Sequence, residues 1–161
     1  MDVAALLQKK GEAHLYKNEF QRAKETFDSA MQIKKNLSGP VSMPVASSLY
    51  CLGTAYYYLN DFSHAMLLFQ ECLKIQVKLA GENDVGVVRS LCWIGRHHEK
   101  LKEPEKALER YLAALRIYKK DMASIDYRVV VMLLHSTGRL YEDEKVSLEE
   151  MALKCKWKLG L

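Results

Sequence analysis

Apolar side chains recur along this chain at intervals of three and four residues, the spacing of one helix face. One such face is formed by Val45, Leu49, Leu52 and Tyr56. A polar Asn-Asp pair then interrupts the pattern, and a second stripe starts at Phe62. Alternation of this kind, without strand-like periodicity, predicts an all-α chain. The expected helices span residues 3–16, 20–36, 43–58, 62–79, 85–101, 104–120, 126–143 and 147–159.

The helical pattern returns after 42 residues, as Gly11, Gly53 and Gly95 show. A fixed interval kept by many positions indicates repeated structural units. Two consecutive helices fit into each interval, so each unit is expected to be a helical hairpin. Five more small or apolar positions keep the interval: Ala23, Ala65 and Ala107; Phe27, Phe69 and Tyr111; Ala30, Cys72 and Ala114; Met31, Leu73 and Leu115; and Ile33, Ile75 and Ile117.

A weaker fourth copy follows the three good ones. Leu134 and Gly138 lie 43 residues after Leu91 and Gly95, so one residue is inserted between the third and fourth copies. We therefore predict a single domain over residues 1–161, with repeats at about 4–37, 43–79, 85–120 and 126–159, the last degenerate.

The repeated glycines require a packing reason, because glycine in a helix costs about 1 kcal/mol relative to alanine. We expect each to mark a close helix crossing, with the aromatic ring of Phe27, Phe69 or Tyr111 beside it. Helix starts are also predicted. Ser42 and Asp61 are candidate N-caps, and Pro104 suits a first helical turn.

These positions resemble the tetratricopeptide repeat, most clearly at Leu52-Gly53, Tyr56, Ala65 and Phe69. The 42-residue interval and the run 44–49 are similar to the longer subtype of kinesin light chains and nephrocystin-like proteins. Lys10 and Thr137 depart from the pattern, since Leu52 and Ile94 are apolar at that position. The resemblance implies a right-handed α-α superhelical solenoid whose first helices line a concave groove.

The resemblance also implies an adaptor or scaffold that binds a peptide or helix of another protein in that groove. The alternative is a structural module that self-associates through its C-terminal helix, which ends with Trp157, Leu159 and Leu161. The groove candidates are Gln8, Glu12, Tyr16, Tyr50, Thr54, Tyr57, Tyr58, Arg89, Cys92, Arg96, Lys100, His135 and Arg139.

Two groups among these candidates carry specific hypotheses. The helical spacing of Tyr50, Thr54, Tyr57 and Tyr58 places them on one face, where tyrosines would offer rigid contact area. The alternative is that Tyr56 and one neighbouring residue simply pack in the core. The three arginines, at positions 89, 96 and 139, would form paired hydrogen bonds with carboxylates or phosphate of an acidic peptide. The alternative for them is a solvated surface paired with nearby acidic residues.

Other functional classes find little support in the composition. The net charge is only +4 and no block of like charges occurs, so nucleic-acid binding is not predicted. No apolar run is long enough for a membrane span. The cysteines, at positions 51, 72, 92 and 155, fit no metal framework and indicate reduced thiols in a cytoplasmic protein.

Catalysis and cofactor binding are not predicted either. His97 and His98 are adjacent on a helix and point in directions too different to share a metal ion. His98 occupies the position of Tyr56, which favours core packing. For a pair formed by Cys92 and His135, nothing local would activate the thiol except nearby arginines. The chain contains no nucleotide-binding glycine motif. We expect no enzyme activity and no cofactor.

Overall fold

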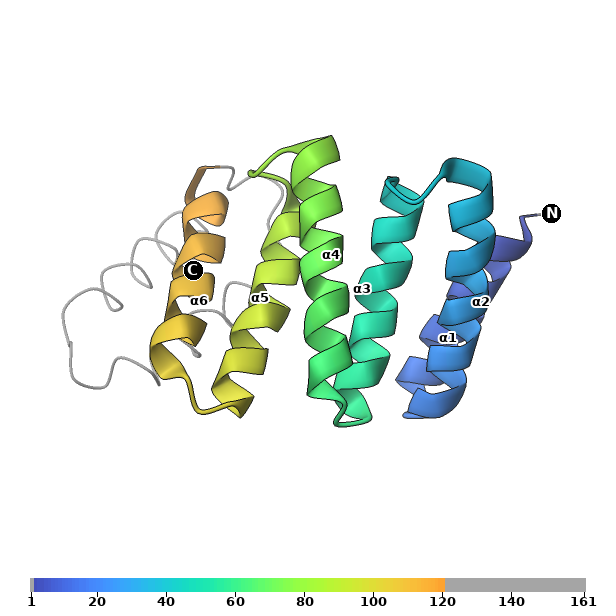
Figure 1. The fold of residues 1–161 in the computed structure, drawn as a ribbon, viewed down its shortest axis with the longest axis horizontal. Coiled ribbons are helices and arrows are strands. Elements are labelled where there is room, and N and C mark those ends of the chain that lie inside the picture. The colour runs from blue at the N-terminus through green and yellow to red at the C-terminus, as the bar shows by residue number, and fades with distance from the viewer. Residues whose placement is uncertain (1, 121–161) are drawn as a thin grey trace, which may run out of the picture.

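The computed structural model describes residues 2–120, which form six α-helices (Figure 1). The predicted helices agree with these to within two residues; α2 and α4 extend to Ser38 and Ala80, and α5 ends at Lys100. The predicted fourth repeat, residues 126–159, lies outside the described residues. The helices are α1 (Val3–Tyr16), α2 (Phe20–Ser38), α3 (Met43–Tyr58), α4 (Phe62–Ala80), α5 (Val85–Lys100) and α6 (Pro104–Lys120).

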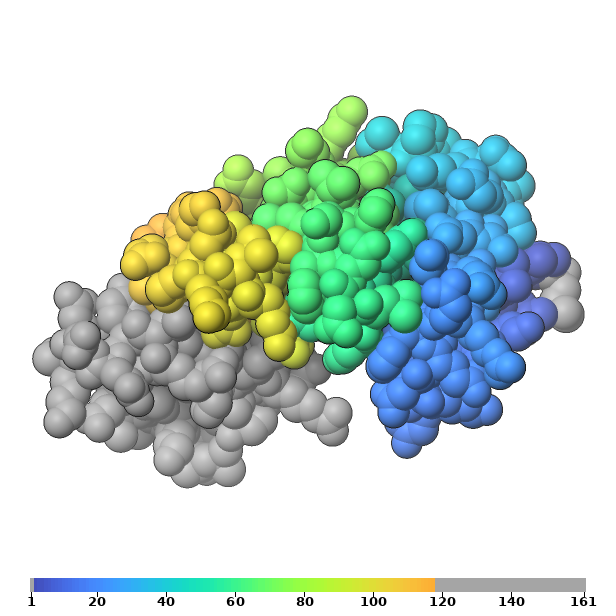
Figure 2. Space-filling view, turned by 60° about the horizontal axis from the view of Figure 1, so that its bottom comes forward, coloured from blue at the N-terminus to red at the C-terminus, as the bar shows by residue number. Residues whose placement is uncertain are grey.

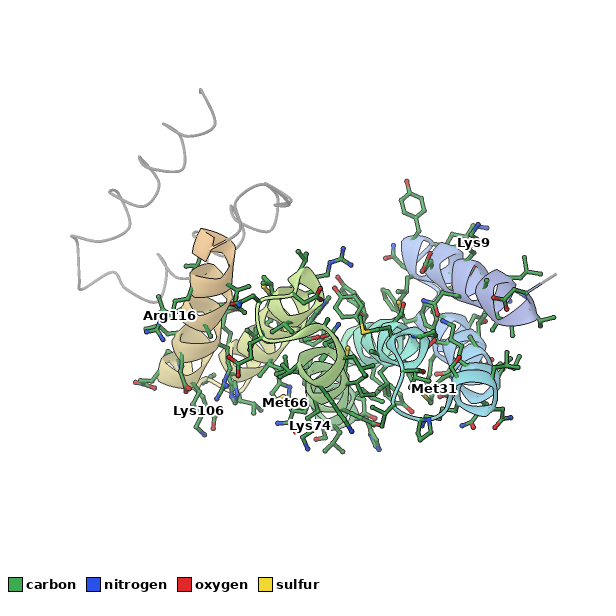
Figure 3. All side chains as sticks on the ribbon, turned by 90° about the horizontal axis from the view of Figure 1, so that it is seen from above. Lys9, Met31, Met66, Lys74, Lys106 and Arg116 are labelled. Atoms are coloured by element: carbon green, nitrogen blue, oxygen red, sulfur yellow. The ribbon has the colours of Figure 1, made fainter. Side chains whose placement is uncertain are left out.

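Consecutive helices pair as three hairpins, α1 with α2, α3 with α4, and α5 with α6, and each hairpin packs on the next. In the space-filling view, the hairpins follow one another from the blue first hairpin to the yellow and orange third (Figure 2). Seen from above, α1, α3 and α5 lie on one side of the molecule, with α2 and α4 on the other (Figure 3). The arrangement is that of stacked helical hairpins. No helix in the described part is long and apolar enough to span a bilayer.

The repeated glycines lie at close helix crossings inside each hairpin. A Cβ atom on Gly53 would lie 2.9 Å from the ring of Phe69 on α4. At Gly11 the corresponding distance to the Phe27 ring is 2.5 Å, and Gly95 has an equally close contact with the ring of its own hairpin. Any side chain larger than hydrogen would displace the buried ring. The predicted packing reason for the glycines is therefore confirmed.

The turns and caps follow local chemistry. The two helices of each hairpin are joined through a residue with positive φ, namely Asn18, Asn60 and Lys102. The carboxylate of Asp61 accepts a hydrogen bond from the His64 amide, as an N-cap should. α6 begins at Pro104, as predicted.

Ser42 behaves differently from the expected cap. It occupies the position before α3, but its side chain makes no cap hydrogen bond. The hydroxyl donates instead to the carbonyl of Gly39, at 3.1 Å, and so stabilises the loop between the hairpins. The prediction of the helix start is confirmed, and the prediction of a side-chain cap is wrong.

A polar contact joins each hairpin to the next at the same repeat position. Lys34 of α2 donates to the hydroxyl of Ser48 on α3, at 2.9 Å, and also to the side-chain carbonyl of Gln8. One repeat later, Ser90 of α5 donates to the side-chain carbonyl of Gln76 on α4, at 2.7 Å. Buried polar groups of this kind fix register, because misalignment would leave them without partners.

The departure at Lys10 has a structural explanation. Its in-phase residues Leu52 and Ile94 are buried, because a preceding hairpin packs against α3 and α5. Lys10 is exposed, since no helix within residues 2–120 covers that face of α1. A charged side chain is therefore tolerated there.

Candidate functional site: an aromatic and basic face on the first helices

Trp93 is the centre of an aromatic cluster between α3 and α5. Its indole N–H donates a hydrogen bond to the hydroxyl of Tyr50, at 2.8 Å. The indole also stacks on Phe69, with ring centroids 5.3 Å apart and planes 8° apart, and meets the edge of Tyr57 at 5.0 Å. These contacts join two neighbouring hairpins through aromatic rings, each of which buries a large apolar area.

Arg96 lies over this cluster, one helical turn beyond Trp93. Its guanidinium carbon is 4.7 Å from the centroid of the Trp93 ring and 5.6 Å from that of Tyr57. A cation over an aromatic face is attracted by the ring's negative centre. The side chain is half-buried, so the stacking holds the guanidinium in place while leaving it partly accessible to solvent.

Tyr58 extends the cluster to the first hairpin. Its ring stacks on Phe20 of α2, with centroids 4.9 Å apart and planes 12° apart, and presents an edge contact to Trp93 at 6.1 Å. Unlike Tyr57, which is buried, Tyr58 is 44% exposed. Of the four members of the predicted tyrosine face, Tyr58 is the one that offers a broad solvent-accessible ring.

Tyr50, which is partly buried, and Tyr57, which is buried, stay protonated. Burial raises the pKa of Tyr50, and its hydrogen bond with Trp93 opposes that effect only partly. Burial also raises the pKa of Tyr57, against the opposing effect of the Arg96 guanidinium. Both phenols are therefore neutral near pH 7. The positive charge of Arg96 is not neutralised by a phenolate.

The basic residues lie along α5. Arg89 and Lys100 are exposed, and Arg96 lies between them. Arg89 and Arg96 are separated by seven residues, or about 10 Å along the helix axis. The two arginines therefore share one helix face without touching the same point. The predicted third member, Arg139, lies outside the described residues, as does His135.

Three other groove candidates are buried. Cys92 belongs to the core around Val87 and Tyr111, and burial raises the pKa of its thiol to about 12. The Thr54 hydroxyl donates to the Tyr50 carbonyl within α3. Gln8 participates in the junction with Lys34 and Ser48. The structure thus places these side chains in the protein interior and not on an open face.

The remaining candidates lie on α1. Tyr16 is 91% exposed, and Glu12 is also exposed. Tyr58 and Lys100 occupy the position of Tyr16 in the second and third repeats. Thr54 and Arg96 occupy the position of Glu12. The charge at the repeat position of Glu12 is therefore acidic on α1 and basic on α5, where Arg96 occupies it.

The structure describes no metal-binding constellation. Within residues 2–120, no three His, Cys, Asp or Glu side chains converge to hold an ion. His98 is largely buried, in line with the expected core packing, and its Nδ1 lies 2.7 Å from the Glu103 carboxylate. His14 and Glu19, in phase with this pair, form the same contact in the first hairpin. These His–Glu pairs connect the two helices of a hairpin.

Trp93 is the site residue that sequence analysis missed. It is in phase with Cys51 and Lys9, so the repeat gave no aromatic at that position. The usable signal was its spacing from Arg96, because residues three apart on a helix are neighbours. A tryptophan three residues before an arginine favours a cation–π contact.

Comparison with known proteins agrees with this architecture. Residues 2–76 match the sequence model of the tetratricopeptide repeat family. This part of the chain therefore consists of tetratricopeptide repeats. Repeats of this family are generally protein–protein interaction modules. No curated protein sequence matches the chain significantly.

Kinesin-light-chain-like repeat proteins are among its structural neighbours. BtubC (BKLC) from P. vanneervenii aligns with a TM-score of 0.80 at 18% identity, over 87% of this chain and 56% of that one. This chain thus spans little more than half the length of BtubC. A kinesin light chain-like protein of Podospora anserina, with nearly identical TPR-like repeats, aligns at 0.81 and 17% identity, over 98% of this chain and 78% of that one. The N-terminal domain of stress-induced protein-1 from C. elegans aligns at 0.60 and 12%, over 84% and 94%. At these identities the likeness concerns the fold alone.

Proposed function

We propose that this chain is an adaptor that binds an acidic peptide or helix of a partner protein across α3 and α5. The stacking of Arg96 on Trp93, at 4.7 Å, is the observation that carries this proposal. In the proposed superhelix the first helices line a concave groove, and Arg96 lies on their face. Its basic neighbours and the ring of Tyr58 complete the proposed surface.

The fixed position of Arg96 favours binding. A free arginine loses side-chain entropy when it pairs with a carboxylate, at a cost of up to about 2 kcal/mol. Stacking on Trp93 and Tyr57 restricts the side chain before a ligand arrives. The planar guanidinium still presents N–H groups at its edge, and these match the two oxygens of a carboxylate. Pre-organisation therefore lowers the cost of recognising an acidic residue.

Tyr58 supplies the second element of the surface. Its ring is partly exposed and is held by Phe20 and Trp93, so it offers rigid apolar area with a hydroxyl. Tyrosine and arginine are enriched at the energetically dominant positions of protein interfaces. A ligand segment that places a carboxylate at Arg96 and an apolar side chain at Tyr58 would contact both elements of the proposed surface.

The experiment compares two fluorescent peptides of equal length, one alternating Glu with Leu and the other Lys with Leu. The proposal expects binding of the acidic peptide by the full chain, and at least about tenfold weaker binding by the Arg89→Glu/Arg96→Glu double variant. Arg116→Glu is the matched control, because Arg116 is an exposed arginine of α6, away from the first helices (Figure 3). Unchanged affinity in the double variant would refute the groove proposal.

The alternative function, self-association through the helix at 147–159, concerns residues that the structure does not describe. It stays a prediction. Light scattering over a range of concentrations measures it directly, with Trp157→Glu as the variant. We propose a cytoplasmic location for the adaptor, because Cys51, Cys72 and Cys92 are free thiols, as is usual in a reducing compartment.

A further inference from the structure

α1 carries an apolar surface at positions that neighbouring hairpins cover elsewhere in the molecule. Val45 and Val87 are 0% and 3% exposed, because the preceding hairpin packs on α3 and on α5. Their in-phase residue Val3 is 56% exposed. Within residues 2–120, no helix lies against this side of α1, which we call the α1 outer face and define by Val3, Leu6, Lys10 and Ala13.

Leu6 is apolar at a repeat position where the other junctions between hairpins have a polar residue. Ser48 and Ser90 occupy its position on α3 and α5, and each pairs with a polar side chain of the preceding helix. Leu6 cannot form such a bond, and its side chain is 52% exposed. A helix with the chemistry of α2 or α4 would place Lys34 or Gln76 against a leucine and leave that polar group without a partner. The helix that fits here carries an apolar residue instead.

Lys10 adds a charge requirement to the α1 outer face. It is exposed, whereas Leu52 and Ile94 at the same position are buried under a preceding helix. Lys17, seven residues later on the same side, is exposed as well. A helix covering this half of α1 must present carboxylates, because a buried lysine without a counter-charge is costly. Ala13 is exposed and small, so it leaves room for close approach.

The direction of the covering helix follows from the existing junctions. Lys34 lies near the end of α2 and contacts Ser48 near the start of α3, so these helices run antiparallel. A helix placed on α1 in the same way would begin near Lys17 and end near Val3. Its carboxylates would then lie in its N-terminal half, where they also interact favourably with the helix dipole.

We propose that the α1 outer face binds an amphipathic helix of a partner protein, antiparallel to α1. The partner helix carries carboxylates in its N-terminal half, opposite Lys10 and Lys17. It carries apolar residues in its C-terminal half, opposite Leu6 and Val3. This surface is separate from the groove on α3 and α5 and does not depend on it.

A second copy of the chain fits the α1 outer face poorly. Two α1 helices packed antiparallel about a twofold axis would meet near their midpoint, which is close to Lys10. The two lysines would then face each other, and like charges at an interface disfavour association. The charge pattern thus selects a different, acidic partner.

The test uses two designed helical peptides of the same composition and the length of α1. In one, glutamates precede leucines along the binding stripe; in the other, the order is reversed. The full chain is titrated against each peptide by fluorescence anisotropy. The proposal expects the glutamate-first peptide to bind at least about tenfold more tightly than the reversed one. Equal binding, or no binding of either peptide, would overturn it.

Three variants locate the binding. Leu6→Ser introduces the residue found at the same repeat position on α3 and α5, and Lys10→Glu reverses the charge. Each should weaken the binding of the glutamate-first peptide about tenfold. Two controls, Leu37→Ser at an exposed leucine of α2 and Arg96→Glu, should leave the affinity for this peptide unchanged. An effect of Arg96→Glu equal to that of Lys10→Glu would place the peptide in the groove and refute the proposal. Concentration-dependent dimerisation abolished by Leu6→Ser would identify the occupant as a second copy and refute it too.

Discussion

Gly53 of α3 lies so close to Phe69 of α4 that a single added carbon atom would come within 2.9 Å of the phenyl ring. The ring is fully buried and also stacks on Trp93 of the next hairpin. It therefore cannot move without disturbing the junction between hairpins. One glycine controls both the crossing inside its own hairpin and the aromatic cluster beside it.

Replacing Gly53 with alanine should destabilise the protein. Overpacking a core costs about 1–3 kcal/mol, and the better helix propensity of alanine returns about 1 kcal/mol. Because the Phe69 ring also stacks on Trp93 and cannot yield, we expect a cost in the upper part of that range. The free energy of unfolding, measured with urea, should then fall by about 1–2 kcal/mol. Ser47→Ala, at an exposed position of α3, is the control and should be near neutral. A Gly53→Ala protein as stable as the parent would contradict the crossing.

The hydrogen bond between Trp93 and Tyr50 should appear as a coupling energy. A double-mutant cycle with Tyr50→Phe and Trp93→Phe should give about 0.5–1.5 kcal/mol, the net contribution of a typical hydrogen bond. Tyr58→Phe combined with Trp93→Phe is the matched cycle, because those rings meet edge-on and no hydroxyl bond joins them in the described contacts. Equal coupling in the two cycles would show that the hydrogen bond contributes nothing.

The thiols of the described helices should resist modification in the folded protein. Burial raises the pKa values of Cys51 and Cys72 to about 11 and that of Cys92 to about 12. The thiolate is the reactive form, so almost none is present at pH 7. In a Cys155→Ser background, Ellman's reagent should react slowly without denaturant and with three thiols in urea. Rapid reaction of the folded variant would contradict the burial.

Stability should rise with pH through the range in which histidines titrate. Burial lowers the pKa of His97, His98 adds a smaller effect in the same direction, and Glu103 opposes it. The folded state therefore binds a proton less readily than the unfolded chain, whose histidine pKa is about 6.5. As pH falls below that value, protons bind preferentially to the unfolded chain and stability decreases.

Urea unfolding at about pH 5.5 and 7.5 checks this expectation, because the two values bracket the unfolded pKa. His97→Ala, which introduces the residue found in phase at Ala55, should reduce the difference in stability between the two pH values. His64→Ala removes an exposed histidine and should retain it. A pH difference that is identical in the parent and in His97→Ala would show that His97 is not its source.

The sequence predicted the helices and crossings because both depend on local periodicity. Gly53 and Phe69 belong to one hairpin, and their spacing is visible in every copy. The site was harder to predict. Which residues of a first helix are covered depends on how far each hairpin rotates relative to the last, and periodicity does not report that rotation. Cys92 was therefore expected on the groove surface although it is buried, and Trp93 was overlooked.

Each glycine and its aromatic ring are only sixteen residues apart, as Gly11 with Phe27 and Gly53 with Phe69 show. Contacts between residues so near in sequence require little loop-closure entropy, and chains rich in them fold fast. A hairpin emerging from the ribosome thus contains both halves of its own crossing before the next hairpin is made. We expect this chain to acquire structure progressively during synthesis, in order from its N-terminus.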